Sequence, residues 1–291
     1  MNTQTNKART KKQRIGARIA VAASAAAVAA TVWGVTTLVD NGHGAPHRNV
    51  SRQRDANANP DGSDDRPPEQ QGRPGQSGQQ GQPGRIPEGI AHDSESGGSA
   101  VNITIDDGPD PRWTPKVLDV LAKHDVKATF CMIGPQAKAH PDLVKKVVAA
   151  GHRLCDHTMD HNTSMDKKPV AYQEQQILDA KRLIEEAAGG GAKVEYYRAP
   201  GGAFTPDSRR IAAANGMRPL GWNVDTKDFD KPGVAAIVGA VKNEIGNGPT
   251  ILFHDGGGNR TQSVEALDQV LAWLKEQGRP TGFPVRTAPS S

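Results

Sequence analysis

The sequence predicts an α/β domain, built as a small or incomplete barrel, over residues 99–283. Segments with the two-residue period of a β-strand alternate there with segments of helical period, which is typical of a parallel sheet with crossover helices. Six or seven such units fit into this stretch, enough for one domain. Polar motifs follow several of the predicted strands directly, and active groups in such folds gather at the carboxyl ends of strands.

The strand at residues 101–105 is the clearest single element. Its apolar residues Val101, Ile103 and Ile105 alternate with polar ones, so one face is strongly apolar. Shorter apolar runs predict further strands at 127–133, 153–155, 194–197, 220–224 and 250–253. Helical spacing, with proline in first turns and glycine after last turns, predicts helices at 114–123, 141–150, 169–188, 206–214, 233–245 and 261–277.

The N-terminal 39 residues predict a membrane segment. Residues 1–18 form a basic arm with six Lys or Arg and no acidic residue, and residues 19–39 carry no charge. These 21 residues, at ~1.5 Å rise each, just span a hydrocarbon core. The segment is either a transmembrane anchor or a signal, and the lack of an Ala-x-Ala site just after it favours the anchor. The basic arm should stay in the cytoplasm, which makes residues 40–291 extracytoplasmic, or secreted if the segment is cleaved.

Residues 40–98 have the composition of a disordered linker. They contain eleven Gly and seven Pro but no aromatic residue. Such a segment cannot bury enough apolar surface to offset the entropy lost on ordering. It would let a membrane-tethered domain reach into a cell wall. At the other end, residues 284–291 are expected to form a C-terminal tail.

The charge distribution argues against nucleic acid as a partner. The formal net charge is +4, yet residues 1–18 carry six basic residues, while residues 99–291 hold 24 basic and 23 acidic residues. A nearly neutral domain has no basic face for a phosphate backbone. Nothing in the sequence predicts a protein partner, and a monomer is expected.

The two cysteines, Cys131 and Cys155, both lie in the part that is predicted to be exported. An oxidising compartment permits a disulfide between them. Two buried free thiols are the alternative, because the sequence does not give their separation.

Two groups of polar residues after predicted strands indicate a metal. Asp106 and Asp107 are adjacent carboxylates that repel each other, and a cation is the simplest compensation; a plain polar turn is the alternative. His157 and His161 would point the same way on a helical turn. Two imidazoles and one carboxylate form the ligand set of a catalytic zinc with an open position. Surface histidines also occur at this spacing, so the metal site depends on the combination.

The groups after predicted strands, in this order, resemble the motifs of the polysaccharide deacetylases (NodB homology domain, carbohydrate esterase family 4), in particular peptidoglycan and chitooligosaccharide deacetylases of the actinobacterial type. The resemblance covers residues 99–283, and five ordered motifs are more specific than any one of them. It implies an irregular (β/α) barrel and a divalent metal, usually zinc, which ions such as Co²⁺ can replace. The motifs are Thr104-Ile105-Asp106-Asp107-Gly108-Pro109, His157-Thr158-x-x-His161, Arg198-x-Pro200-Gly201, Asp225-x-x-Asp228-Phe229 and Leu252-x-His254.

The resemblance implies a role for each matching residue. Asp107, His157 and His161 would hold the metal, which activates a water molecule and polarises the acetyl carbonyl. Asp106 would be the general base, and Arg198 would pair with it and keep it ionised. Taken alone, this arginine would be an ordinary ion-pair residue.

The remaining motif residues would complete the catalytic site. The backbone N–H of Gly201 would contribute to an oxyanion hole. His254 would protonate the leaving group, with Asp228 orienting its ring; taken alone, this histidine would be structural. Leu252 and Phe229 would form the walls of the acetyl pocket.

Two positions depart from the family pattern. Ile105 stands where phenylalanine is usual, a hydrophobic exchange that should leave the chemistry intact. Phe229 stands where tryptophan is usual, and its smaller ring would widen or dry the substrate groove. Asp255, Asn259 and Arg260, in the glycine-rich loop after His254, are taken as structural residues.

The sequence therefore predicts a metal-dependent hydrolase that removes acetyl groups from N-acetylglucosamine residues of a cell-wall polysaccharide. Peptidoglycan is the preferred substrate and chitooligosaccharides come next. An acetylxylan esterase is the alternative enzyme. A catalytically inactive carbohydrate-binding protein is the alternative from another class, but Asp106, Asp107, His157, His161 and His254 are all present.

Overall fold

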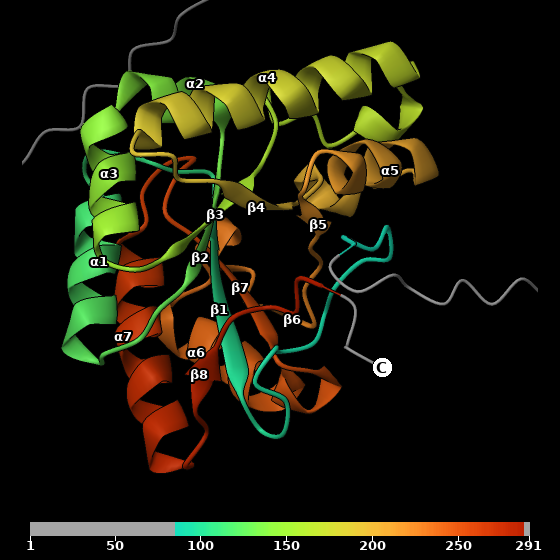
Figure 1. Ribbon diagram of the computed structural model, residues 1–291. Coiled ribbons are helices and arrows are strands. Elements are labelled where there is room, and N and C mark those ends of the chain that lie inside the picture. Colours follow the sequence, from blue (N-terminus) through green and yellow to red (C-terminus); the bar gives the residue numbers. More distant parts are fainter. Residues whose placement is uncertain (1–84, 288–291) are drawn as a thin grey trace, which may run out of the picture. The chain divides into compact units, whose positions relative to one another are not determined.

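The computed structural model describes residues 85–287, and within them eight parallel strands form one sheet (Figure 1). The order is β5-β4-β3-β2-β1-β7-β6, and β8 pairs with β1. β5 and β6 are consecutive in the chain but lie at opposite edges of the sheet, so the barrel is incomplete, as predicted. The strands are β1 (Val101–Asp106), β2 (Thr129–Met132), β3 (Arg153–Asp156), β4 (Val194–Tyr197), β5 (Arg218–Pro219), β6 (Val224–Asp225), β7 (Thr250–His254) and β8 (Thr281–Gly282).

The predicted basic arm and membrane segment, residues 1–39, lie outside the described residues, as do most of the predicted linker and residues 288–291. Among the helices of residues 85–287, none is long and apolar enough to cross a membrane.

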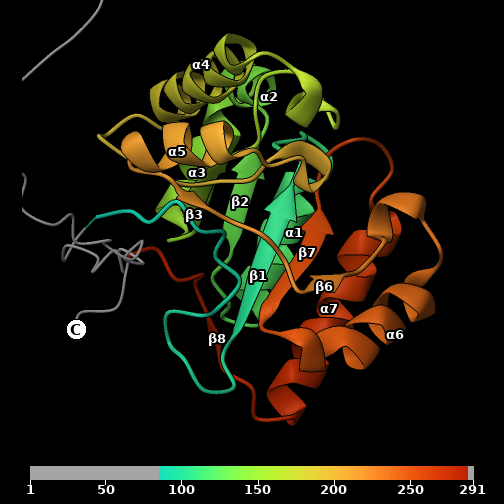
Figure 2. The same ribbon diagram turned by 90° about the vertical axis from the view of Figure 1, so that its right-hand side faces the viewer.

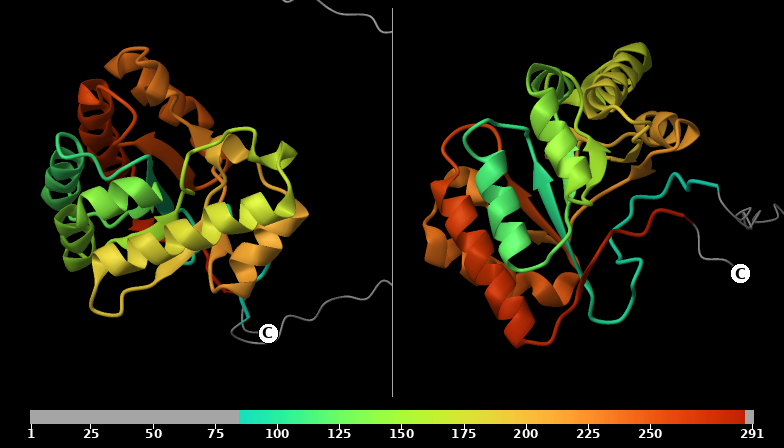
Figure 3. Two further views of the ribbon diagram at one scale, coloured as in Figure 1. Left: turned by 90° about the horizontal axis from the view of Figure 1, so that it is seen from above. Right: turned by 60° about the vertical axis from the view of Figure 1, so that its left-hand side comes forward.

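Helices connect the strands and cover the sheet (Figures 1 and 3). α1 and α7 lie side by side, and Lys123 of α1 pairs with Asp268 of α7 at 2.8 Å. The α-helices are α1 (Thr114–Lys123), α2 (Gly134–Ala139), α3 (Pro141–Ala149), α4 (Val170–Ala188), α5 (Pro206–Ala214), α6 (Val234–Glu244) and α7 (Thr261–Glu276). Short 3₁₀ turns occur at Met165–Lys167, Pro200–Gly202, Asp228–Asp230 and Ile245–Asn247.

Most of the predicted elements are confirmed, but the single strand predicted at 220–224 is wrong. β5 ends at Pro219 and β6 begins at Val224, because the chain between them crosses from one edge of the sheet to the other (Figure 2). Leu220, just after β5, is fully buried and makes an isolated bridge to Ala91. α2 and β8 were not predicted, since six and two residues are too few to show a period.

The alternation in β1 separates two environments. Val101, Ile103 and Ile105 pack into the main core beneath the helices. The intervening Thr104 and Asp106 face the interior of the open barrel, and both are fully or almost fully buried. The strongly apolar face predicted for this strand is therefore the helix-covered one, and the polar face points toward the site.

A disulfide joins Cys131 and Cys155 on the interior face of the barrel. The two cysteines are register partners on the neighbouring strands β2 and β3. They form a small second core with Tyr196, Leu220 and Ala91. Cys131 is also the register partner of Asp106, so this bond lies directly beside the end of β1.

Residues 85–98, called here the N-terminal strap, contact the domain rather than forming part of a linker. Ala91 is 1% exposed; its N–H donates to Pro219 O (2.8 Å), and its carbonyl accepts from Gly221 N–H (2.9 Å). The predicted linker boundary at residue 98 is therefore wrong. The predicted tail boundary at 284 is wrong as well, because Val285 N–H donates to Asp93 O (2.9 Å) and the two segments lie side by side (Figure 1).

Shortening a core side chain of β1 tests the packing of the main core. Ile103 is 1% exposed, so Ile103→Ala should lower the free energy of unfolding by about 2–5 kcal/mol, through lost burial and the cavity left behind. Urea unfolding of the purified chain measures this. The matched control Val170→Ala, at a position that is 41% exposed on α4, should change it by less than about 0.5 kcal/mol. Equal effects of the two substitutions would contradict the described core.

Candidate active site

The predicted site residues meet at the carboxyl ends of the strands. Asp106 ends β1 and His254 ends β7, and the two are register partners on adjacent strands. They open into a cavity of about 440 Å³. Predicted site residues on its wall are Asp106, Asp107, His157, His161, Gly201, Phe229, Leu252 and His254, while Arg198 and Asp228 lie behind them.

Asp107, His157 and His161 are arranged as a metal-binding group. One ligand atom from each lies within 4.8 Å of the others. Asp107 Oδ1 is 3.2 Å from His161 Nε2 and 3.6 Å from His157 Nε2. This buried oxygen has no hydrogen-bond partner within residues 85–287. Two imidazole nitrogens and an unsatisfied carboxylate oxygen that converge in this way fit a shared divalent cation.

The two histidines converge from a loop, not from a helical turn. β3 ends at Asp156, and the residues up to the 3₁₀ turn at Met165 form no regular element. Thr158 and His161 have positive φ angles of 68° and 53°, and this reversal brings the rings to 4.9 Å between centroids. The prediction that they point the same way is confirmed, but the helical turn offered for it is wrong.

His157 is oriented for coordination through Nε2. Its Nδ1 lies 2.8 Å from Arg198 O and donates to that carbonyl, which leaves Nε2 directed toward Asp107. Burial lowers the pKa of His157, although the charges of Asp106 and Asp107 oppose this. A neutral imidazole is the form that binds a metal.

Asp106 forms a buried ion pair with Arg198. Arg198 Nη1 donates to Asp106 Oδ1 at 2.7 Å, and neither side chain is more than 3% exposed. The guanidinium also donates to Thr104 Oγ1, Leu220 O and Gly221 O. The predicted contact is therefore present, and it leaves Asp106 Oδ2 for the cavity, 3.5 Å from His157 Nε2.

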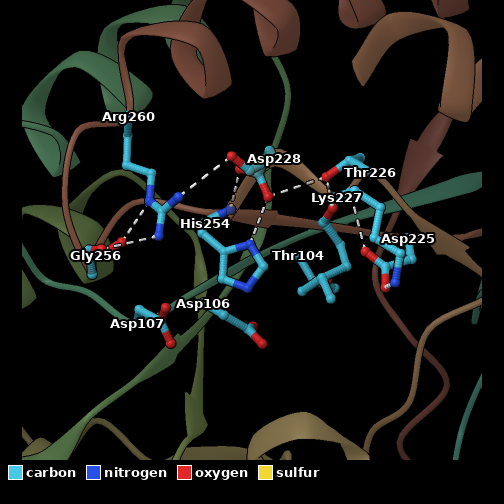
Figure 4. A network of polar contacts seen from close by, with 12 residues as sticks. Thr104, Asp106, Asp107, Asp225, Thr226, Lys227, Asp228, His254, Gly256 and Arg260 are labelled. Atoms are coloured by element: carbon cyan, nitrogen blue, oxygen red, sulfur yellow. Dashed lines mark hydrogen bonds and ion pairs between the residues drawn. The ribbon is translucent and has the colours of Figure 1, made fainter. Parts of the chain in front are cut away.

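His254 is held by Asp228 (Figure 4). His254 Nδ1 donates to Asp228 Oδ1 at 2.6 Å, and the backbone N–H of His254 donates to Asp228 Oδ2 at 3.0 Å. Thr226 Oγ1 donates to the same carboxylate. Because Nδ1 carries the proton in this bond, Nε2 is the ring nitrogen left for the cavity.

The two partners shift each other's pKa in opposite directions. Burial lowers the pKa of His254, but the hydrogen bond and charge of Asp228, with the charges of Asp106 and Asp107, outweigh it, so that the pKa lies above its ordinary value. Burial raises the pKa of Asp228, but the hydrogen bond and charge of His254 outweigh it, and the pKa lies below its usual range. The pair thus favours an imidazolium beside a carboxylate.

The walls of the cavity include predicted and unpredicted residues. Leu252 is buried and Phe229 is 39% exposed, with its ring edge-on to that of His254 at 5.4 Å. Three residues that were not predicted also line the cavity: Thr163, Trp222 and Lys227. Trp222 precedes the fourth motif by three residues and Lys227 lies within it, and this proximity was the signal that could have identified them.

The loop after His254 stabilises the site, as the sequence analysis assumed. Arg260 Nε donates to Gly256 O at 2.6 Å, within the same loop (Figure 4). Asp255 accepts from Thr114 Oγ1 at 2.6 Å, and its backbone N–H donates to Asp106 O. Burial raises the pKa of Asp255 to about 7, with the charges of Asp107 and Asp106 adding to the effect.

Comparisons with known proteins agree with this geometry. The sequence profile of the family "Polysaccharide deacetylase" matches residues 93–220. A chitooligosaccharide deacetylase of Sinorhizobium fredii is 38% identical over 210 residues, which cover 68% of this chain and 94% of the relative. A peptidoglycan-N-acetylglucosamine deacetylase of Bacillus cereus is 39% identical over 183 residues, which cover 61% of this chain and 83% of the relative.

A solved structure is similar over the same part of the chain. The crystal structure of the Bc1960 peptidoglycan N-acetylglucosamine deacetylase superimposes with a TM-score of 0.62 at 30% identity, covering 67% of this chain and 90% of that one. This chain thus shares the fold of that structure and covers most of the length of these relatives. Its motifs also stand in the order expected for the family. The chain belongs to the polysaccharide deacetylases, the NodB homology or carbohydrate esterase 4 family.

Proposed function

We propose that this deacetylase hydrolyses the acetamido group of N-acetylglucosamine residues in a cell-wall glycan, and that its metal is zinc. One observation carries the proposal: Asp106 and His254, each held by a buried charged partner, face a single cavity together with the three candidate metal ligands. A base, an acid and a cation at one site are the groups that amide hydrolysis requires.

Peptidoglycan is the preferred substrate of this proposal, with chitooligosaccharides next. The names of the relatives support both, since one is a chitooligosaccharide deacetylase and another a peptidoglycan-N-acetylglucosamine deacetylase. The predicted anchor at 19–39 favours peptidoglycan, because it would hold an extracytoplasmic domain beside the wall. The proposed enzyme is a monomer. O-Deacetylation of acetylxylan is the second candidate, since the same groups can cleave an ester, which is easier to hydrolyse than an amide, and Phe229 stands where tryptophan is usual in the family.

Asp107, His157 and His161 would hold the zinc, which when bound polarises the acetyl carbonyl and lowers the pKa of a water molecule. Asp106 takes the proton of the attacking water at Oδ2, because Oδ1 is engaged by Arg198. That ion pair keeps the base in place while its protonation state changes. The adjacent residues Asp106 and Asp107 thus have different roles, as general base and as metal ligand.

The developing negative charge on the acetyl oxygen is stabilised by the backbone N–H of Gly201. His254 donates a proton from Nε2 to the sugar nitrogen as the C–N bond breaks, which releases acetate and the free amine. Asp228 stabilises the imidazolium before this step. Leu252 and Phe229 enclose the methyl group of the acetyl substituent.

Acetate release from a panel of glycans tests the proposal. We expect the purified chain to release acetate from peptidoglycan and chitooligosaccharides, to lose this activity with a chelator and to regain it with added zinc. Release from acetylxylan alone would instead identify an esterase. Zinc binding without release from any substrate would indicate a carbohydrate-binding protein.

Replacing the base should separate chemistry from metal binding. Asp106→Asn keeps the shape of the side chain but removes the proton acceptor, so kcat should fall by about 10²–10⁴-fold. The zinc content, measured by elemental analysis, should stay at the parental level because Asp106 is not a predicted ligand. Asp119→Asn, at an exposed position on α1, is the matched control. A variant at position 106 with most of its activity would refute the assigned role.

The pH profile tests the pair of His254 and Asp228. The acid must be protonated, and its raised pKa keeps it so above the ordinary histidine range; activity is therefore lost as the pH rises through that raised value. Asp228→Asn removes the charge that raises the pKa, while burial still lowers it. The alkaline limb of kcat should accordingly move to lower pH. A limb that stays in place or moves upward would contradict the assignment.

A further inference from the structure

The N-terminal strap is bonded to the segment that crosses between β5 and β6. Ala91 N–H donates to Pro219 O at 2.8 Å, and Ala91 O accepts from Gly221 N–H at 2.9 Å. Ala91 also forms an isolated parallel bridge with Leu220. The two hydrogen bonds flank Leu220, so they fix the peptide groups on both sides of this residue.

One of these peptide groups connects the strap with Arg198. The N–H of the bond between Leu220 and Gly221 donates to Ala91 O, and its carbonyl, Leu220 O, accepts from Arg198 Nε at 3.2 Å. A trans peptide group is planar, and its N–H and C=O point in opposite directions. The hydrogen bond to the strap therefore sets the direction of the carbonyl that meets Arg198. The next carbonyl, Gly221 O, accepts from Arg198 Nη2 at 2.8 Å.

These two carbonyls determine where the remaining nitrogen of Arg198 points. The side chain is fully buried, and its Nη1 donates to Thr104 Oγ1 at 2.9 Å and to Asp106 Oδ1 at 2.7 Å. A guanidinium is a rigid, planar fork. Because Nε and Nη2 are held by the crossing segment, the plane of the group is fixed and Nη1 is directed at the proposed general base.

The strap is itself anchored to the two central strands of the site. His92 O accepts from Thr250 Oγ1, at the start of β7, at 2.6 Å, and Asp93 O accepts from Asn102 Nδ2, on β1, at 3.2 Å. The two anchoring side chains are fully buried and bond to each other at 2.9 Å. β1 ends in the proposed base and β7 in the proposed acid, so the strap connects the crossing segment to both of these strands.

The strap and the crossing segment approach each other closely. A Cβ atom at Gly221 would lie 2.3 Å from a ring carbon of His92. A side chain at this position would have to displace the histidine ring. Glycine therefore permits the contact between the two segments.

We propose that the N-terminal strap is a positioning element of the active site: it orients Arg198 through the peptide group of Leu220 and Gly221, and thereby the general base Asp106. The inference rests on the proposed function, because it gives the strap a part in the same reaction. No residue of the strap lines the active-site cavity. The strap thus acts through Arg198 and not by contact with the substrate.

Releasing the strap in the full-length protein tests this role. Ala91→Pro removes the N–H that bonds to Pro219 O and places a ring carbon against that oxygen. We expect kcat on the tetrasaccharide of N-acetylglucosamine to fall by about tenfold, as for a misplaced reacting group, while KM and zinc content keep their parental values. Ala91→Gly keeps both backbone hydrogen bonds and should retain most of the activity.

A second substitution releases the strap at its other anchor. Thr250→Val removes the hydroxyl that donates to His92 O but keeps the shape of the side chain, and it should also lower kcat at constant KM. Thr250→Ser keeps the hydroxyl and should restore most of kcat. If Ala91→Pro does not yield folded protein by circular dichroism, this pair decides the test. Parental kcat in every folded strap variant would overturn the positioning role.

A double-mutant cycle tests whether the strap acts through Arg198. Arg198→Lys keeps the charge but loses the planar fork. In that background, Ala91→Pro or Thr250→Val should lower the remaining kcat by less than about twofold, because the connection to Asp106 is already broken. The full tenfold loss in both backgrounds would show that the strap acts elsewhere, and would overturn the inference.

A matched control separates positioning from stability. Val147→Ala on α3 shortens a fully buried side chain, which lowers the free energy of unfolding, and it should leave kcat unchanged at temperatures where the protein is folded. An equal loss of kcat in this variant would overturn the positioning role and leave the deacetylase proposal in place. No acetate release by the parental protein would instead refute the proposed function, and the inference with it.

Discussion

The site depends on the buried ion pair of Arg198 and Asp106. Taking both charges out of water is costly, and their attraction offsets that cost only if the remaining hydrogen-bonding groups are also satisfied. Arg198 meets this condition through Thr104 Oγ1 and the carbonyls of Leu220 and Gly221. One side chain thus connects β4, β1 and the crossing between β5 and β6. Truncating either partner would leave an uncompensated buried charge. Truncating Arg198 would also remove the hydrogen bonds that connect the end of β4 with β1 and with the crossing between β5 and β6.

The adjacent aspartates can differ in role because their backbone and surroundings differ. Asp106 is the last residue of β1 and points to the barrel interior, where Arg198 accompanies it. Asp107 follows with a φ of 76°, outside the strand conformation, and its side chain turns toward the two histidines. A regular strand would have sent the second carboxylate to the helix-covered face. The reversal at Asp107 therefore places both carboxylates at one cavity while keeping them on separate partners.

Most residues of this site could be predicted from the sequence, because they follow strands whose parallel pairing brings the carboxyl ends of the strands to one edge of the sheet. Local patterns placed Asp106, His157 and His254 at or just after predicted strands, and the resemblance to the family supplied their roles, since His254 taken alone would be structural. The N-terminal strap could not be predicted in this way. Ala91 is buried by pairing with Leu220, a partner far along the chain, and its own neighbourhood has the glycine and serine content of a linker. Likewise, residues 220–224 resembled one strand because Leu220 and Val224 are both buried, and the sequence does not show that the chain crosses between the two edges of the sheet within this run.

The open barrel leaves a gap between the two edges of its sheet, which the N-terminal strap covers. A closed barrel would pair its two edge strands, but the edge strands β5 and β6 are not paired, and the residues between them cross the gap. The crossing includes Gly221 and Trp222, and the strap covers it by pairing with it. The backbone groups that β5 and β6 would satisfy by pairing with each other are in part satisfied by the strap, because Ala91 pairs with Pro219 and Gly221.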